Sequence, residues 1–293
     1  MAKKTVLITG INGFLGSNLA QSLSRDYHII GLEKDFCCLN NINNEQFKVY
    51  SSDQNPEIIF QENQLFAIVH AATKYNRNDE SLEALINTNI LLPVKLFELA
   101  NQYDVSLFIN TDTFFNNPDY QYSYLSAYTL SKSQVLDWFR NIKGSTKLIN
   151  MKLFHIYGPN DAMSKFIPSI ISRIKNNEAS IDLTNGEQER DFVYIDDVIN
   201  AYKVVLNRFD SLEGNHITIE TGTGNATSIK ELVIKVKELS NSTSRLNFGA
   251  LPQRSNEIMH AIANNEVLKS LGWRQKSNLE SNLLKIIDLS NEQ

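Results

Sequence analysis

Two residues with complementary acid–base chemistry, Tyr128 and Lys132, lie four positions apart in a segment with helical spacing. This spacing puts both side chains on one face of a helix. Hydride transfer to a ketone creates an alkoxide that needs a proton, and a tyrosine can supply it if its pKa falls from about 10 toward 7. A neighbouring lysine ammonium favours the phenolate and so lowers that pKa. The pair therefore predicts hydride chemistry at a carbonyl, with a packed tyrosine beside a surface lysine as the simpler alternative.

A third residue that could share this chemistry is Thr111. It ends a predicted strand that begins with the apolar run 106–109, and open α/β sheets bind their ligands at the carboxyl ends of strands. A hydroxyl there can hydrogen-bond a substrate oxygen beside the tyrosine, although a backbone cap is the ordinary role of such a threonine. We therefore expect Thr111, Tyr128 and Lys132 to be the catalytic residues.

A GxxGxxG turn formed by Gly10, Gly13 and Gly16 predicts a dinucleotide site. The first glycine allows a tight turn, the second lets the backbone approach a pyrophosphate, and the third lets helix and strand pack closely. The helix that follows offers free N–H groups and its positive dipole end to the phosphates. The expected cofactor contacts in this turn are Gly10, Asn12, Gly13, Phe14, Leu15 and Gly16.

The end of the second predicted strand bears on which dinucleotide is bound. A carboxylate at Glu33 can accept both ribose hydroxyls of NAD, and it repels the 2′-phosphate of NADP. Lys34 could pair with that phosphate, or it could be only a solvated surface charge. The sequence therefore predicts NAD or NADP as cofactor, with NAD slightly favoured.

These residues need a frame of alternating strands and helices to position them. Apolar runs predict strands at 5–8, 27–32, 65–69, 106–109 and 148–153, and helical spacing is present at 14–23, 85–99 and 127–142. The alternation predicts an α/β fold with a doubly wound parallel sheet of the Rossmann type. The rhythm loosens after Pro159. We therefore expect a dinucleotide-binding domain over 1–158, with some later segments returning to it, and a smaller C-terminal substrate-binding lobe over 159–293.

The composition limits the class of protein. With 28 Lys and Arg against 33 Asp and Glu, the formal net charge is −5, which leaves no basic footprint for nucleic acid. The sequence contains no run of about 18 apolar residues, so it predicts no membrane-spanning segment. The two cysteines, Cys37 and Cys38, are adjacent, a spacing that rarely forms a disulfide and indicates no metal site. We therefore expect a cytoplasmic protein without membrane, metal or nucleic-acid partners.

The motifs together resemble those of the extended short-chain dehydrogenase/reductase family. Beside the glycine turn and the Tyr128–Lys132 pair, the matching segments are 70–72, Asn89, 157–159, 186–192 and 265–273, which extend over nearly the whole chain. The resemblance implies a nucleotide-sugar oxidoreductase that binds NAD or NADP on a Rossmann domain. The further cofactor contacts that it implies are His70, Ala71, Ala72 and Asn89, together with Tyr128 and Lys132 themselves.

The resemblance also implies which residues bind a nucleotide-sugar substrate. Arg190 and Arg254 would grip its pyrophosphate, with Lys165 as a third cation, because arginine offers a bidentate fork to phosphate. Glu257 would hold the nucleotide ribose, and His155 would contact the substrate. Each of these could instead be a surface ion pair or a satisfied polar group. The remaining implied substrate contacts are Thr73, Asp112, Thr113 and Phe166.

A closer resemblance is to the reductases that form CDP-abequose and CDP-paratose, and segments 111–115, 165–168 and 248–259 carry it. It implies reduction of the C4 ketone of a CDP-linked 4-keto-6-deoxy or 3,6-dideoxy sugar, as in lipopolysaccharide O-antigen biosynthesis. The family's dehydratases carry Asp-Glu after the catalytic threonine, whereas this chain has Asp112-Thr113, which argues against 4,6-dehydration. The alternatives are a 4-epimerase that retains its NAD and, more remotely, a cofactor-binding regulator with an inactive site.

The family resemblance also implies a homodimer. Its members dimerise by packing two long helices of each subunit into a four-helix bundle, and here the candidates are the 85–99 region and the helix that carries Tyr128. On that helix Leu130 and Trp138 point away from the face of Tyr128 and Lys132. Large apolar side chains on a second face indicate burial against a partner, with burial under another part of the same chain as the alternative.

Overall fold

The structure is a computed structural model that describes residues 3–34, 39–42, 45–75, 80–120 and 124–289. Its contacts divide the chain into two compact units. Unit 1 comprises residues 1–118, 124–152 and 202–219, and unit 2 comprises residues 119–123, 153–201 and 220–293. The chain therefore leaves unit 1 near residue 152 and returns to it at residue 202. The assignment of dinucleotide binding to 1–158 and of substrate binding to 159–293 stays a prediction.

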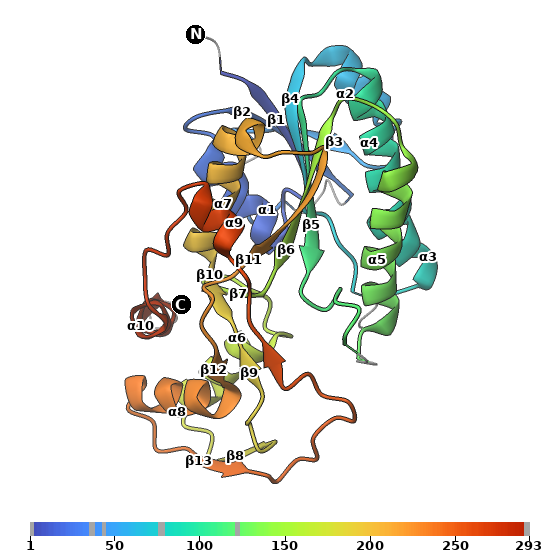
Figure 1. Cartoon of the computed structure of the whole chain (residues 1–293). Helices are drawn as coiled ribbons and strands as arrows, with labels where there is room; N and C mark the ends of the chain where they lie inside the picture. Colours follow the sequence, from blue (N-terminus) through green and yellow to red (C-terminus); the bar gives the residue numbers. More distant parts are fainter. Residues whose placement is uncertain (1–2, 35–38, 43–44, 76–79, 121–123, 290–293) are drawn as a thin grey trace. The chain divides into compact units, whose positions relative to one another are not determined.

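Unit 1 is built around a sheet that has seven strands in the described residues, in the order β11-β6-β5-β4-β1-β2-β3 (Figure 1). The pairs β3–β2, β2–β1, β1–β4 and β4–β5 are parallel. The strand order reverses between β1 and β4, the position at which doubly wound sheets bind ligands. The predicted α/β fold with a doubly wound parallel sheet is confirmed. The strands are β1 (Thr5–Thr9), β2 (His28–Glu33), β3 (Lys48–Ser51), β4 (Leu65–His70), β5 (Leu107–Thr113), β6 (Lys147–Leu153) and β11 (His216–Thr221).

Helices lie on both faces of this sheet, with α1 on one side and α4 and α5 on the other (Figure 1). A π-helix, η1 (Asn87–Leu91), joins α3 to α4 without a break, and α7 passes from unit 2 into unit 1 at residue 202. A short 3₁₀ turn, η2 (Phe209–Ser211), follows α7. The helices are α1 (Phe14–Leu23), α2 (Glu57–Glu62), α3 (Leu82–Ile86), α4 (Leu92–Gln102), α5 (Ser126–Asn141) and α7 (Ile195–Arg208).

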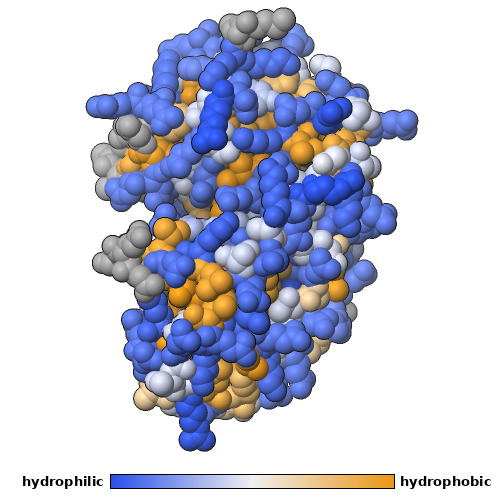
Figure 2. Space-filling model, turned by 90° about the vertical axis from the view of Figure 1, so that its left-hand side faces the viewer, coloured by the Kyte–Doolittle hydropathy of each residue, from blue (hydrophilic) through white to orange (hydrophobic). Residues whose placement is uncertain are grey.

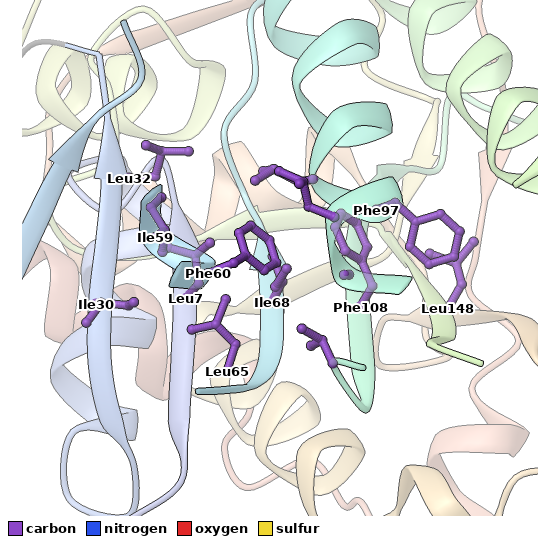
Figure 3. Close-up of a cluster of buried hydrophobic side chains, with 14 of the residues drawn as sticks. Leu7, Ile30, Leu32, Ile59, Phe60, Leu65, Ile68, Phe97, Phe108 and Leu148 are labelled. Carbon is purple, nitrogen blue, oxygen red and sulfur yellow. The ribbon is translucent and has the colours of Figure 1, made fainter. Parts of the chain in front are cut away.

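A buried hydrophobic cluster holds α4 and α5 against the sheet (Figure 3). Phe97 of α4 packs edge-on against Phe108 of β5 and Phe139 of α5, with ring centroids 5.3 and 5.1 Å apart. Burial of each large apolar side chain contributes about 1.5–3 kcal/mol. The buried face of α5 carries Val135 and Phe139 together with Tyr128 and Lys132. The packing that holds the helix against the sheet therefore also fixes the positions of Tyr128 and Lys132.

The sequence predicted most strands of unit 1 to within a residue or two, and α1 at its observed bounds. The predicted helix over 85–99 corresponds to α3, η1 and α4 together, which extend from Leu82 to Gln102. The sequence missed β3, α2 and β11, and it ended the β5 strand too early. The prediction that Thr111 ends this strand is wrong, because β5 continues to Thr113. Polar residues at Asn110, Asp112 and Thr113 concealed the continuation, yet all three are buried. Asn110 and Asp112 have side-chain partners from Asn150 in the neighbouring strand β6.

Unit 2 consists of small sheets and short helices. In its described residues β7 pairs with β10, β9 lies between β12 and β14, and β13 pairs with β8. The helix α8 begins with a capping box between Ser228 and Glu231, which satisfies two backbone N–H groups at the helix start. The elements are β7 (His155–Tyr157), α6 (Phe166–Lys175), β8 (Ser180–Leu183), β9 (Glu189–Arg190), β10 (Phe192–Tyr194), β12 (Thr227–Ser228), α8 (Ile229–Leu239), β13 (Arg245–Phe248), β14 (His260–Ala261), α9 (Glu266–Ser270) and α10 (Leu279–Leu289).

The surface is mixed in polarity. The face drawn in Figure 2 carries hydrophobic patches of limited size among hydrophilic side chains. Within the described ranges, no helix is long and apolar enough to cross a membrane. Cys37 and Cys38 lie outside the described residues, so the expectation that they form neither a disulfide nor a metal site stays a prediction.

Candidate active site

The glycine turn between β1 and α1 is a tight backbone cradle. Gly10 has φ +63°, and a Cβ built on it would lie 2.7 Å from the Cα of Ala72. A Cβ on Gly16 would lie 2.0 Å from the carbonyl oxygen of Gly10. Gly13 is exposed at the start of α1, where no side chain caps the helix. The turn therefore needs glycine at its first and last positions and exposes the helix N-terminus at its second, as a dinucleotide phosphate requires.

Glu33, the last residue of β2, is tied to this turn. Its Oε2 accepts a hydrogen bond from the backbone N–H of Asn12 at 3.1 Å, and its Oε1 accepts one from the N–H of Lys34 at 3.0 Å. The Asn12 side chain in turn accepts from the N–H of Asn41 at 2.9 Å. Lys34 itself is exposed. The carboxylate predicted to select the cofactor therefore lies beside the backbone predicted to bind the phosphates.

The end of β4 contributes a buried imidazole to the same region. His70 is fully buried, and its Nδ1 lies 2.9 Å from Oγ1 of Thr9. The same Thr9 oxygen accepts from the N–H of Ala72 at 3.1 Å, which joins the ends of β1 and β4. Burial, and secondly the charge of Lys132, lower the pKa of His70 well below its ordinary value, so the ring is neutral at physiological pH.

Tyr128, Lys132 and Thr111 come together at the carboxyl end of β5. Nζ of Lys132 donates a hydrogen bond of 2.8 Å to the backbone carbonyl of Thr111 and lies 5.9 Å from the centroid of the Tyr128 ring. The Lys132 side chain is 2% exposed, and burial lowers its pKa to about 8 against the opposing effect of Asp112. At neutral pH the lysine is therefore mostly charged. The structure brings together the three residues that the sequence singled out, and it adds a buried carboxylate.

That carboxylate, Asp112, already receives several hydrogen bonds within the protein. It accepts from the N–H of Thr113 at 2.7 Å, from Nδ2 of Asn150 at 2.8 Å and from Nδ2 of Asn116 at 3.1 Å. Desolvation raises its pKa, while these hydrogen bonds and Lys132 lower it. The arrangement suits a buried counter-charge for Lys132. The predicted substrate contacts of Asp112 and Thr113 stay predictions, and the sequence missed Asn116 and Asn150.

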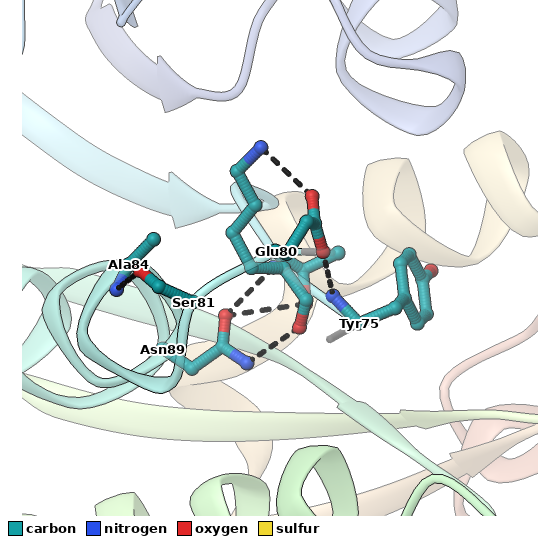
Figure 4. Close-up of polar contacts among 7 residues, drawn as sticks. Tyr75, Glu80, Ser81, Ala84 and Asn89 are labelled. Atoms are coloured by element: carbon teal, nitrogen blue, oxygen red, sulfur yellow. Dashed lines mark hydrogen bonds and ion pairs between the residues drawn. The ribbon is translucent and has the colours of Figure 1, made fainter. Parts of the chain in front are cut away.

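Asn89 of η1 fixes the loop that follows β4 (Figure 4). Its Nδ2 donates to the carbonyl of Lys74 at 2.8 Å and to Oγ of Ser131 at 3.0 Å, and its Oδ1 accepts from the N–H of Lys74 at 2.9 Å. The Ser131 hydroxyl in turn donates to the backbone carbonyl of Tyr128 at 2.7 Å. The Tyr75 ring lies 4.8 Å from that of Tyr128. Asn89 thus ties the loop after β4 to helix α5 one turn from Tyr128, and its direct contact with a cofactor stays a prediction.

In unit 2, Arg190 is buried with a carboxylate. Its Nη2 lies 2.5 Å from Oε1 of Glu257, and its Nη1 donates to the carbonyls of Glu189 and Ile258. The two side chains are 7% and 8% exposed. His155 lies on β7, next to β10. Desolvation, with a smaller effect of Arg190, lowers the pKa of His155 to about 3, so this imidazole is neutral.

The other predicted cations of unit 2 differ in their surroundings. Lys165, at the start of α6, pairs with Asp161 at 2.8 Å, and that carboxylate is 2% exposed. The i,i+4 spacing of Asp161 and Lys165 was the available signal for this pair, which the sequence analysis missed. Arg254 and Phe166 are exposed. The structure brings Arg190 and Glu257 together, and the roles of all these residues toward a substrate stay predictions.

The sheet order and the glycine turn define an α/β protein of the dinucleotide-binding class. Residues 6–219 match the NAD dependent epimerase/dehydratase family, and the chain belongs to this family.

Among curated proteins, the chain is similar to CDP-abequose synthase of Salmonella muenchen, with 35% identity over 98% of both chains. It is also similar to CDP-abequose synthase of Salmonella typhimurium, with 33% identity over 93% of both chains. Among solved structures it resembles UDP-N-acetylglucosamine 4-epimerase from Methanobrevibacter ruminantium, with a TM-score of 0.85, 20% identity and 100% coverage of both chains. That likeness shows the fold.

Proposed function

We propose that this protein reduces the C4 ketone of a nucleotide-linked 4-keto sugar with NAD(P)H, and that the sugar is a 6-deoxy or 3,6-dideoxy sugar carried by CDP. The observation that carries the proposal is the cluster at the end of β5, in which the buried Lys132 ammonium contacts Thr111 and faces the Tyr128 ring. The similarity to two CDP-abequose synthases supports the choice of the nucleotide and of a deoxy sugar.

The residues of the cluster divide the work of the reduction. NAD(P)H supplies the hydride when bound. Tyr128 donates its proton to the carbonyl oxygen as negative charge develops there, so that the ketone becomes a secondary alcohol and the phenolate regains a proton from solvent. Lys132 stabilises that phenolate by its charge, and the Thr111 hydroxyl orients the carbonyl. Asp112 compensates the buried charge of Lys132.

The cofactor fits the residues of unit 1. The turn at Gly10 and Gly16 has no room for a Cβ, and its exposed helix start suits a pyrophosphate. Glu33 is within reach of that turn through Asn12 and would accept hydrogen bonds from the adenosine ribose of NAD. Lys34 would favour the 2′-phosphate of NADP. The repulsion between Glu33 and that phosphate supports a modest preference for NAD.

The substrate contacts are proposed on unit 2. Arg190 and Arg254 would bind the diphosphate, with Lys165 assisting, because a guanidinium group can form two parallel hydrogen bonds to a phosphate. Since Arg190 contacts Glu257, binding would leave Glu257 one oxygen for the nucleotide ribose. His155 is neutral, so it would hydrogen-bond the substrate without adding charge.

The test uses a panel of nucleotide-linked 4-keto sugars with NADH or NADPH, followed by the absorbance of the reduced nicotinamide. Wild-type protein should oxidise the cofactor with a CDP-linked 4-keto sugar, and Tyr128→Phe should lower turnover by at least about 10²-fold while still binding cofactor. Tyr27→Phe removes a hydrogen-bonded tyrosine hydroxyl outside the cluster and serves as the control. Near-normal turnover by Tyr128→Phe would remove Tyr128 from the role of proton donor.

A 4-epimerase is the second candidate, because the same tyrosine–lysine pair could return a hydride to the opposite face of the sugar, and the fold is shared with a solved 4-epimerase. Such an enzyme would hold NAD through purification and would interconvert nucleotide sugars without consuming free NAD(P)H. The same assay therefore separates the two candidates by the consumption of the reduced nicotinamide.

We further propose a homodimer formed by the helical face of unit 1 that contains α3, η1 and α5. α5 packs beside α3 and η1. Large apolar side chains of these helices remain 44–57% exposed, and contiguous exposed apolar surface is typical of a protein–protein interface. They are Leu82, Ile86, Leu91, Leu130 and Trp138.

A further inference from the structure

A buried tyrosine outside the predicted site touches one of its catalytic residues. Tyr202, on α7, is fully buried, and its hydroxyl lies 2.8 Å from Oγ1 of Thr111. Within the part of the chain that the structure describes, Thr111 is the only polar partner of this hydroxyl. Both residues belong to unit 1, although 91 positions separate them in the sequence.

The direction of this hydrogen bond follows from the number of protons. Each hydroxyl has one proton to donate, and burial raises the pKa of Tyr202, so the phenol stays protonated. If Thr111 donated to Tyr202, the phenol proton would be buried without an acceptor, which is costly. If Tyr202 donates, both atoms are satisfied, because Thr111 is only half-buried and its own proton can reach a ligand.

We infer that Tyr202 is a positioning residue that donates its proton to Oγ1 of Thr111 and thereby keeps the Thr111 proton available for the ketone oxygen of the substrate. This inference rests on the proposed function and specifies how one of its residues is prepared. A threonine hydroxyl can occupy more than one rotamer and can donate or accept. The fixed phenol selects the rotamer and the polarity, and a hydroxyl that already accepts a hydrogen bond is a stronger donor.

The purely structural alternative is that Tyr202 fills the core and its hydroxyl has simply found a partner, as buried tyrosines usually do. Tyr27 provides the matched control. It is also buried, and its hydroxyl donates at 2.9 Å to Oδ1 of Asn207, which lies on the same helix α7. Tyr202→Phe and Tyr27→Phe therefore each remove one hydrogen-bonded hydroxyl of a buried tyrosine, and in each pair one partner lies on α7. Only Tyr202 lies beside Thr111.

The kinetic experiment measures kcat and KM with the 4-keto sugar that the panel assay identifies. Tyr202→Phe should lower kcat by about 5- to 20-fold, the value of one oriented hydrogen bond, with the KM for the cofactor unchanged. Tyr27→Phe should leave kcat unchanged. In a Thr111→Val background, Tyr202→Phe should have no further effect, because the hydroxyl that it positions is already absent. Equal kcat values for Tyr202→Phe and Tyr27→Phe would overturn the positioning role.

A second experiment needs no activity. Thr111→Val removes the acceptor of the Tyr202 proton and should lower the Tm by roughly 2–6 °C, whereas Tyr202→Phe should lower it less. The double variant Thr111→Val/Tyr202→Phe should melt above Thr111→Val alone, because it removes the buried proton that has lost its acceptor. If Tyr202→Phe lowers the Tm as much as Thr111→Val or more, the proposed direction of the hydrogen bond is wrong. If wild-type protein reduces no 4-keto sugar, the proposed function fails and so does the role of Tyr202 in it, and the melting cycle still decides the hydrogen bond.

Discussion

Replacement of Lys132 by methionine would isolate the electrostatic part of the proposed mechanism. Methionine is similar in length and lacks the charge, and the site is buried, so the ammonium acts with little solvent screening. Nζ lies 5.9 Å from the centroid of the Tyr128 ring. Two unit charges at that separation interact by about 3 kcal/mol at an effective dielectric constant of about 20. If this energy stabilises the developing phenolate, its loss slows the chemical step by about 10²-fold.

The assay is single-turnover oxidation of NAD(P)H at pH 7 with saturating cofactor and 4-keto sugar, where the pKa of about 8 leaves Lys132 mostly protonated. Because the Lys132 ammonium loses its proton and its charge above its pKa, the lysine-dependent part of the wild-type rate should also decline as the pH rises past about 8. Lys147→Met is the control, since Lys147 is also partly buried and donates to the carbonyl of Phe209 at 3.0 Å. A fall of less than about threefold for Lys132→Met, or full recovery at higher cofactor concentration, would refute the electrostatic role.

The remaining predictions concern cofactor, substrate and assembly. Wild-type kcat/KM should favour NADH over NADPH by about tenfold or less. Glu33→Ala should narrow or reverse that preference, and Lys34→Ala should lower kcat/KM for NADPH more than for NADH. A wild-type preference for NADPH above tenfold would contradict the role given to Glu33. Arg254→Ala should raise the KM of the nucleotide sugar with little change in kcat, because the diphosphate is held in both ground and transition state. Arg190→Ala should do the same and also lower the Tm, because Glu257 would lose its buried partner; an unchanged KM in both variants would exclude these arginines from the site. Trp138→Glu should shift the mass measured by light scattering at micromolar concentration from dimer to monomer, and a monomeric wild type would refute the dimer.

The sequence predicted what local spacing encodes. Gly10 and Gly16 showed the tight turn, and the four-residue spacing of Tyr128 and Lys132 placed both on one helix, because glycine conformation and helical period are local properties. It did not predict Asn150 or Tyr202. Their hydrogen bonds to Asp112 and Thr111 form only when strands and helices that are distant in the sequence pack together. A single asparagine or tyrosine in the sequence gives no pattern from which such a partner could be predicted.

The end of strand β5 was missed for the same reason, because the partner of its polar residues lies elsewhere in the sequence. The polar run from Asn110 to Thr113 has no hydrophobic period, and a strand is recognised in sequence mainly by that period. The buried amide of Asn150 compensates the polar groups, so the strand continues where the pattern stops. Where a site needs buried polar residues in a strand, these residues interrupt the hydrophobic period, and the strand is then missed in a prediction from sequence.

The π-helix η1 has a consequence for insertions and deletions. A π-turn holds one residue more than an α-turn, so η1 takes up its extra residue within a single turn. Deletion of one residue between Asn87 and Leu91 would leave one regular α-turn, and the helix before it would keep nearly the same rotation about the axis. Leu82 and Ile86 would then stay on their present side of the helix. The cost would fall on Asn89, which lies inside the turn and contacts both Lys74 and Ser131 from there. The extra residue therefore serves the loop beside Tyr128 and not the apolar side chains of α3.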